Sequence, residues 1–226
     1  MERYAIIVAG GSGSRMGTDI PKQFLSLGNA PILMHTVKRF FGFSEKIHII
    51  VVLPEEQIDR WRELCKKNQF NIPHAIVAGG KTRFESVRNG LKSIGDNGEA
   101  LIAIHDGVRP FISKQLINNA YTSAETLGNA VASVPLKDSI RKIEKGKNTA
   151  VDRAQYRIMQ TPQAFLFSKI FAAFTVEESP LFTDDAAVAE ASGIKINLID
   201  GSYDNIKITT PEDLALAEAI IKKFEF

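Results

Sequence analysis

The stretch that decides the fold runs Ala5-Ile6-Ile7-Val8-Ala9-Gly10-Gly11-Ser12-Gly13-Ser14-Arg15-Met16-Gly17 and is followed by Pro21-Lys22-Gln23. Its short apolar start predicts a buried strand that stops at once in a loop of Gly and Ser. Glycine lets the backbone bring N–H groups close to a ligand, and successive bare N–H groups form a concavity that favours anions. Two cations near the loop suit phosphate oxygens. The stretch therefore predicts a polyphosphate cradle made of Ala9, Gly10, Gly11, Ser12, Gly13, Ser14, Arg15 and Lys22.

This glycine-rich loop matches neither of the two better-known phosphate-binding patterns. Walker A requires a Gly-Lys-Ser/Thr ending, but Lys22 follows Pro21. The dinucleotide fingerprint requires a glycine where Met16 stands and an acidic residue at the end of a second strand, and both are missing. A tight strand-to-helix turn is the simpler interpretation of the glycines alone, but such a turn needs no cations.

Composition is typical of a single globular domain covering residues 1–226. The chain has 226 residues, of which 44% are hydrophobic and 24% charged, and a formal net charge of +2. Dispersed charges give no basic stripe, so we expect no nucleic-acid partner. The one cysteine, Cys65, excludes an internal disulfide and is expected to be a core thiol. With no apolar run near 18 residues and no room for a signal peptide, we expect a cytoplasmic protein without a membrane partner.

Strand-like and helix-like segments alternate along the chain. Near-continuous apolar strands between helices predict an α/β fold, with a parallel sheet covered by helices on both faces. The strands are expected at 5–8, 47–53, 75–78, 101–104, 130–134, 195–200 and 205–209. Helices are expected from Pro31, from Pro54, and at 84–94, 114–127, 184–191 and 211–224, the last with Thr210 as N-cap and Pro211 at its first position.

Three loops are predicted at the carboxyl ends of these strands, where ligands bind in such sheets. They are residues 9–17, 79–83 and 105–110, and each carries glycine and a charged residue.

Residues 136–160 have a different pattern. Polar and apolar residues alternate over 137–144, a turn follows at 145–148, and 149–153 returns, which predicts a β-hairpin with little apolar material. A two-stranded ribbon is marginal alone, so it needs a surface to lie against. A second copy of the chain is the simplest candidate, and the chain's own sheet is the alternative.

Several motifs, taken together and in order, resemble those of the 2-C-methyl-D-erythritol 4-phosphate cytidylyltransferases of the non-mevalonate isoprenoid pathway. Besides the opening stretch they are Gly79-Gly80-Lys81-Thr82-Arg83-Phe84-Glu85-Ser86-Val87, His105-Asp106-Gly107-Val108-Arg109-Pro110, Val151-Asp152-Arg153, Gln160-Thr161-Pro162-Gln163, Thr183-Asp184-Asp185 and Asp204-Asn205-Ile206-Lys207-Ile208-Thr209. The resemblance implies a Rossmann-like, mostly parallel sheet and a homodimer joined by a protruding β-arm, here 136–160. It implies Mg²⁺ or another divalent cation, with CTP and a sugar-alcohol phosphate as substrates and pyrophosphate as a product.

The resemblance also assigns roles to residues. Arg15 and Lys22 match the family's transition-state cations, and Arg153 and Lys207 its substrate-positioning cations, Arg153 reaching the partner's site. The implied CTP contacts beyond the first loop are Gly80, Arg83, Ser86, Asp106 and Gly107. The implied sugar-phosphate contacts are Asp106, Arg109, Ser139, Arg153, Thr161, Thr183 and Lys207. Ser139 stands where the family usually has Thr, and Lys81 where an acid is common.

The implied chemistry needs no general base, because a phosphate monoester is largely dianionic near neutral pH. This fits a sequence without an obvious nucleophile–base pair. Asp106 is the candidate Mg²⁺ ligand, since Mg²⁺ usually takes only one or two protein carboxylates. The alternative role for Asp106 is a cap on the loop before Pro110.

Three other functions remain to be distinguished. A ribitol-5-phosphate cytidylyltransferase shares the cradle and the His105-Asp106 loop, although Val151-Asp152-Arg153 is closer to the methylerythritol family. An NAD(P) oxidoreductase would need a glycine at position 16. A nucleotide sensor would bind CTP without turnover.

Overall fold

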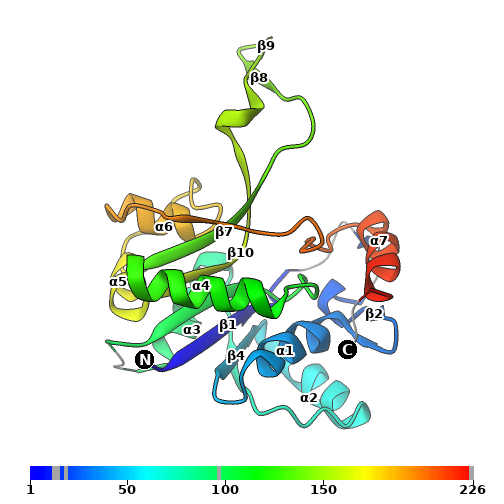
Figure 1. Cartoon of the computed structure of the whole chain (residues 1–226). Helices are drawn as coiled ribbons and strands as arrows, with labels where there is room; N and C mark the ends of the chain where they lie inside the picture. The colour runs from blue at the N-terminus through cyan, green and yellow to red at the C-terminus, as the bar shows by residue number, and fades with distance from the viewer. Residues whose placement is uncertain (12–15, 18–19, 96–97, 224–226) are drawn as a thin grey trace.

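A seven-stranded sheet forms the centre of the chain (Figure 1). The computed structural model describes residues 1–11, 16–17, 20–95 and 98–223. The strand order is β11-β7-β10-β6-β1-β4-β5. The bounds are β1 Arg3–Val8, β4 His48–Leu53, β5 Ala75–Ala78, β6 Leu101–Asp106, β7 Asn129–Pro135, β10 Arg157–Leu166 and β11 Leu198–Asp200.

The sheet is mostly parallel, as predicted. Strand β1 lies between β4 and β6 and is parallel to both, with Ile6 opposite Ile50 on one side and Ile104 on the other. The pairs β4–β5 and β7–β11 are also parallel. Strand β10 runs antiparallel between β6 and β7. The carboxyl ends of β1, β4, β5 and β6 therefore meet at one edge.

Helices cover both faces of the sheet because successive strand residues point to opposite sides. In β1, Ile7 belongs to a core formed with α1, α2 and α4, whereas Ile6 belongs to a core formed with α3, α5 and α6. The first set of helices spans Ile32–Phe43, Ile58–Lys67 and Lys114–Leu127, and the second Arg83–Lys92, Phe167–Ala173 and Asp185–Ala191. A smaller core packs α7, Pro211–Ile221, against a short hairpin of β2, Ser26–Leu27, and β3, Ala30–Pro31.

Side-chain caps fix where several helices begin. Thr82 accepts from the backbone N–H of Glu85 at the start of α3. Thr210 and Asp213 form a reciprocal capping box at the start of α7, with Pro211 at the first position, which confirms the predicted cap.

The sequence analysis missed β10 and α5, besides the short hairpin of β2 and β3. Strand β10 carries Gln160, Thr161 and Gln163, all buried, so its pattern lacks the apolar run that marks the other central strands. A register irregularity between Met159 and Gln163 breaks the alternation further. The strand is polar because its middle section lies beside the site described below.

Several predicted elements differ from those in the structure. The expected strand at 195–200 is only Leu198–Asp200. The expected strand at 205–209 does not form: Asn205 N and Ile206 N donate to the loop just before them, and Ile208 N donates to Val108 O at 3.0 Å. The helix expected from Pro54 begins with a 3-10 turn, Glu55–Gln57, before α2.

The predicted hairpin forms and projects from the sheet (Figure 1). Its strands are shorter than predicted and its turn is limited to residues 145–146: β8, Arg141–Glu144, and β9, Lys147–Ala150, pair only with each other. Every residue of the two strands is exposed, and Ile143 is 71% exposed. The hairpin therefore does not pack on the chain's own sheet, which excludes one of the two surfaces that could support it.

Two smaller expectations concern Cys65 and the membrane. Cys65 is half-buried and packs at the margin of the core under α2, where burial raises the pKa of its thiol to about 11. Within the described part of the chain, no helix is both long and apolar enough to cross a membrane.

We expect Gly90→Ala to destabilise the protein by about 1 kcal/mol. A Cβ at Gly90 would lie 2.8 Å from Ile6 Cγ2 and 3.1 Å from Val52 Cγ2, where α3 packs on the sheet. Overpacking lowers the free energy of unfolding by ~1–3 kcal/mol, and the better helix propensity of alanine offsets ~1 kcal/mol of this loss. Urea unfolding measures the change. Gly98→Ala is the control, because among the described residues no atom beyond its chain neighbours lies within 4 Å of its Cβ position. Equal effects of the two substitutions would contradict the packing described here.

Candidate active site

The three predicted loops meet at one edge of the sheet, where backbone hydrogen bonds join them to neighbouring strand ends. Ala9 N donates to Val52 O at 2.9 Å, Gly79 N to Leu53 O at 2.7 Å and Gly107 N to Val8 O at 2.8 Å. These bonds continue the strand pairing by one residue beyond each strand. The predicted convergence of the loops is confirmed.

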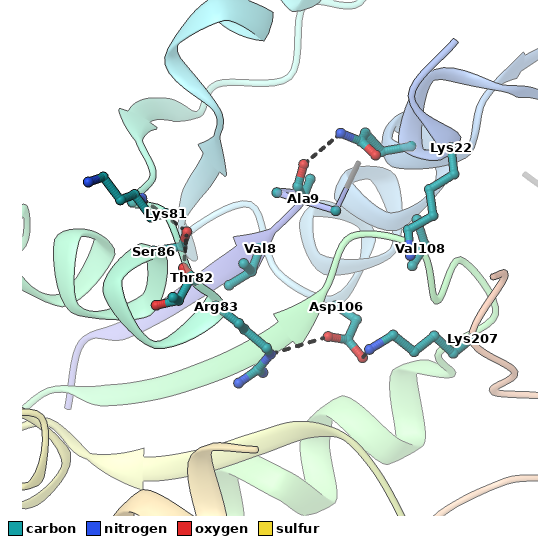
Figure 2. Close-up of a pocket in the computed structure, with 14 residues that line it drawn as sticks. Val8, Ala9, Lys22, Lys81, Thr82, Arg83, Ser86, Asp106, Val108 and Lys207 are labelled. Atoms are coloured by element: carbon teal, nitrogen blue, oxygen red, sulfur yellow. Dashed lines mark hydrogen bonds and ion pairs between the residues drawn. The ribbon is translucent and has the colours of Figure 1, made fainter. Parts of the chain in front are cut away.

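A cavity of about 190 Å³ lies between these loops (Figure 2). Eight of the predicted CTP-binding residues line it: Ala9, Gly10, Gly11, Lys22, Gly80, Arg83, Ser86 and Asp106. Ser12, Gly13, Ser14 and Arg15 lie outside the described residues. Gly107 does not line the cavity. It packs instead beneath the site, where a Cβ would lie 2.9 Å from Ala9 Cβ, and its carbonyl accepts from Thr36 Oγ1.

Lys22 lies against the glycine-rich loop. A Cβ built on Gly11 would be 3.0 Å from Lys22 Cε and 3.3 Å from its Nζ, so the ammonium lies close to the backbone at Gly11. The neighbouring Gln23 is fully buried and donates to Ala9 O at 2.7 Å and to Gln57 Oε1 at 2.6 Å. Gln23 thus fixes the short 3-10 turn Lys22–Phe24 beside the loop. The sequence analysis gave Gln23 no role.

The loop at 79–83 is held by its own helix. Ser86 Oγ accepts from Gly80 N at 3.1 Å and donates to Thr82 O at 2.8 Å. Lys81 N donates to Glu85 Oε2 at 2.6 Å. A Cβ on Gly80 would lie 2.2 Å from Glu85 Cβ, so only glycine fits there. The Lys81 side chain is exposed at the cavity rim.

Three cations surround the buried carboxylate of Asp106. Oδ2 lies 3.0 Å from Lys207 Nζ and 3.1 Å from Arg109 Nε, and Oδ1 lies 3.7 Å from Arg83 Nε. Burial alone would raise the pKa of Asp106, but the attraction of the three cations outweighs it and holds that pKa well below its usual range. The carboxylate is therefore ionised, and the cluster carries an excess of positive charge.

A second cavity, also of about 190 Å³, adjoins the first. The two cavities share Arg83, Asp106 and Lys207, which we call the shared cluster. Five predicted sugar-phosphate contacts line the second cavity: Asp106, Arg109, Thr161, Thr183 and Lys207. The other two, Ser139 and Arg153, do not reach it within one chain. Both are exposed on the arm segment, where the Arg153 guanidinium donates to the carbonyl of Lys137.

His105 orients the loop that carries Asp106. Its ring is fully buried, with Nε2 3.1 Å from Arg109 O and Nδ1 3.1 Å from Thr161 Oγ1. Thr161 Oγ1 also accepts from Asp106 N at 3.1 Å, so its hydroxyl proton is free to be donated to Nδ1. This network assigns the neutral tautomer with the proton on Nε2, and burial lowers the pKa of His105 to about 4.

The chain resembles a family of known proteins over almost its whole length. The family model described as 2-C-methyl-D-erythritol 4-phosphate cytidylyltransferase (IspD) matches residues 4–223. The chain belongs to this family.

Relatives and solved structures of the cytidylyltransferase family match over nearly their whole length. The 2-C-methyl-D-erythritol 4-phosphate cytidylyltransferase of Bacteroides fragilis is 45% identical over 221 residues, which cover 98% of this chain and all of the relative. The 4-diphosphocytidyl-2C-methyl-D-erythritol synthase of Anaerococcus prevotii superposes with a TM-score of 0.82 at 29% identity, covering 98% of this chain and 96% of that one. The Thermus thermophilus cytidylyltransferase gives 0.78 at 28% identity, covering 98% and 100%.

Asp185 and Asn205 hold residues of the site described above, a role that sequence reasoning missed. Asp185 binds both terminal nitrogens of Arg83 at 2.7 Å. Asn205 accepts from Arg109 Nη1 through its carbonyl at 2.8 Å and donates from Nδ2 to Thr161 O at 2.8 Å. Both residues lie within motifs named in the sequence analysis, but only the folded structure shows that Asp185 holds Arg83 and that Asn205 holds Arg109 and Thr161.

The buried His105 predicts a stability that falls with acid. Its pKa in the fold is about 4, below about 6.5 for an unfolded histidine. Between these values the unfolded state binds more protons, so stability decreases as pH falls through the window, by about 3 kcal/mol in total. Urea unfolding at pH 7 and pH 4 of the wild type and His105→Gln measures this contribution.

We expect His105→Gln to lose the histidine part of this pH dependence, and the exposed His48→Gln to retain it. Parallel stability curves for wild type and His105→Gln would show that the ring is not buried in its neutral form.

Proposed function

We propose that the chain transfers the cytidylyl group of CTP to 2-C-methyl-D-erythritol 4-phosphate, giving 4-diphosphocytidyl-2-C-methyl-D-erythritol and pyrophosphate. The observation that carries this is the pair of adjoining cavities joined by the shared cluster. A transferase that joins two anionic substrates needs two sites with a cationic junction. Family membership and the names of its relatives favour methylerythritol phosphate over ribitol 5-phosphate as the acceptor.

The reaction is a direct displacement at phosphorus. A phosphate oxygen of the sugar phosphate forms a bond to the α-phosphorus of CTP, and the bond from that phosphorus to the oxygen bridging to the β-phosphate breaks. The electron pair leaves with pyrophosphate. Because the attacking phosphate is already ionised, positioning and charge stabilisation supply most of the catalysis.

Specific cations would hold each substrate. In the first cavity Lys22, beside Gly11, binds the α-phosphate, and the predicted partner Arg15 shares this role. In the second cavity Arg109 and Lys207 bind the phosphate of the acceptor. Thr183 offers its hydroxyl to the sugar, whereas the Thr161 hydroxyl, which donates to His105 Nδ1, can only accept a hydrogen bond from it.

Asp106 fits a magnesium site with a single protein carboxylate. Its Oδ2 is held by Lys207 and Arg109, whereas Oδ1 faces Arg83 Nε at 3.7 Å, beyond hydrogen-bond distance, so Oδ1 is available to a further cation. No group of three or more His, Cys, Asp or Glu gathers within the residues that the structure describes. Mg²⁺ suits this, because it usually keeps several waters and binds phosphates as well as one or two carboxylates. When bound, it would neutralise the charge of the triphosphate.

A homodimer through residues 136–160 completes the proposal. The hairpin has no packing on its own sheet, and Tyr156 and Ile158 at its base are 44% and 49% exposed. Ser139 and Arg153 lie on this arm, away from the cavities of their own chain. In a dimer they would reach the second cavity of the partner.

A product assay tests the proposed function. We expect pyrophosphate release with CTP and 2-C-methyl-D-erythritol 4-phosphate in Mg²⁺, and at least about tenfold less with ribitol 5-phosphate or with ATP, GTP or UTP, since a site built to hydrogen-bond one substrate rejects those that leave its polar groups unpaired. Chelation by EDTA should stop turnover, and excess Mg²⁺ should restore it. CTP binding without turnover would point to a nucleotide sensor and overturn the proposal.

Mixed dimers test the sharing of the site. Lys22→Ala should lower kcat by about 10²–10³-fold, as is typical for loss of one preorganised donor, and Arg153→Ala should also be severely impaired. A heterodimer of the two variants has one complete site, so about half of the wild-type activity should return. Differently tagged subunits allow the heterodimer to be purified. Activity no higher than in the two parent variants would show that Arg153 does not act across the dimer.

A further inference from the structure

The guanidinium of Arg83 lies between two carboxylates from different segments. Its two terminal nitrogens donate to Asp185, from Nη1 to Oδ1 and from Nη2 to Oδ2, both at 2.7 Å. Its Nε lies 3.7 Å from Asp106 Oδ1, which is too far for a hydrogen bond. Arg83 thus has one tight partner and one looser one, and the looser partner is the carboxylate between the two cavities (Figure 2).

Asp185 is built to hold this position. It is the first residue of α6, is fully buried, and follows Asp184, which caps the helix by accepting from Ala187 N. Asp184 also accepts from Gln163 Nε2 at 2.8 Å, and Gln163 Oε1 accepts from Ala186 N. The start of α6 is therefore tied to β10 at two points, so Asp185 has little freedom to move.

Arg83 is equally constrained at its backbone. It is the first residue of α3, directly after the N-cap Thr82. The Asp185 pair joins the starts of two helices that lie on the same face of the sheet. One helix carries the loop of the first cavity, and the other follows Thr183 of the second cavity. Two parallel hydrogen bonds between an arginine and a carboxylate fix the orientation of the guanidinium as well as its distance.

We infer that Asp185 is a positioning residue for the cytidylyl transfer: it holds the Arg83 fork away from Asp106, which keeps Oδ1 of that carboxylate available at the junction of the two substrates. The inference rests on the proposed function.

Without the Asp185 charge, the Arg83 fork would turn toward the nearest remaining carboxylates. Asp106 is one of them, and a direct Arg83–Asp106 pair would occupy Oδ1. The nucleotide loop itself would change little, because Gly80 and Lys81 are held by Ser86 and Glu85 within α3. Arg83 itself would still line the first cavity, because Asp106 lines that cavity too. The expected defect is therefore in turnover rather than in nucleotide affinity.

Asp185→Asn tests the inference, because it keeps the shape of the side chain and removes its charge. We expect kcat to fall at least about 30-fold, as for other groups that orient a catalytic residue, while the Kd of CTP, measured by calorimetry without acceptor, changes less than threefold. Glu178→Gln is the matched control. Glu178 lies on the surface in the segment before Asp185, and its carboxylate accepts from Thr82 Oγ1, in the loop before α3. The substitution removes the charge of that carboxylate. Its kcat should stay within twofold of wild type.

A double-mutant cycle shows whether Asp185 acts through Arg83. In an Arg83→Met background Asp185→Asn should change kcat less than threefold further, because the double variant removes both charges of the buried pair. Asp185→Glu keeps the charge but moves it by one methylene, and we expect a kcat loss of at least tenfold with unchanged CTP affinity. If Asp185→Asn does not fold, the kcat and the CTP affinity of Asp185→Glu test the inference.

A wild-type kcat in Asp185→Asn or Asp185→Glu, or a full additive loss in the Arg83→Met background, would overturn the inference. Absence of product with the wild-type protein would instead overturn the proposed function.

Discussion

The attraction between Asp106 and its three cations is the interaction on which the site depends. These charges come from parts of the chain that are far apart in sequence: Arg83 from the start of α3, Arg109 from the loop after β6, and Lys207 from the segment before α7. A buried carboxylate is costly unless it is paired, so this residue gathers cations around itself. The excess positive charge that results is what a junction between two phosphorylated substrates requires.

The parallel sheet makes this gathering possible. Parallel pairing of β1 with β4 and β6 brings the ends of all three strands to one edge, and the single backbone bonds from Ala9, Gly79 and Gly107 hold the following loops there. Glycine is required where the loops come closest, as at Gly80 and Gly107. Antiparallel β10 then adds polar side chains beside β6, which form the wall of the second cavity.

The sequence predicts best what depends on local pattern. The apolar runs of β1, β4 and β6, the cap at Thr210 and the loops after the strands follow from spacing and residue type alone. Strand β10 could not be found in this way, because Gln160, Thr161 and Gln163 are selected for contacts with distant segments rather than for an apolar face. The segment 205–209 alternates polar and apolar residues as a strand does. It pairs with none of the described strands, and its polar residues bind at the site instead, Asn205 to Thr161 and Lys207 to Asp106.

The same distinction applies to the site residues. Lys22, Gly80, Asp106 and Lys207 were identified from motifs, whereas Asp185 and Gln23 act by holding a residue that the motifs already marked. Such supporting contacts join positions 102 residues apart in the case of Arg83 and Asp185, and no local pattern encodes them.

A crystal structure with an unreactive CTP analogue and 2-C-methyl-D-erythritol 4-phosphate tests the central claim most directly. We predict that the α-phosphate lies within hydrogen-bond distance of Lys22, that the acceptor phosphate lies beside Arg109 and Lys207, and that Asp106 stands between the two ligands. A triphosphate bound away from the shared cluster, or an acceptor phosphate bound elsewhere on the chain, would contradict the account.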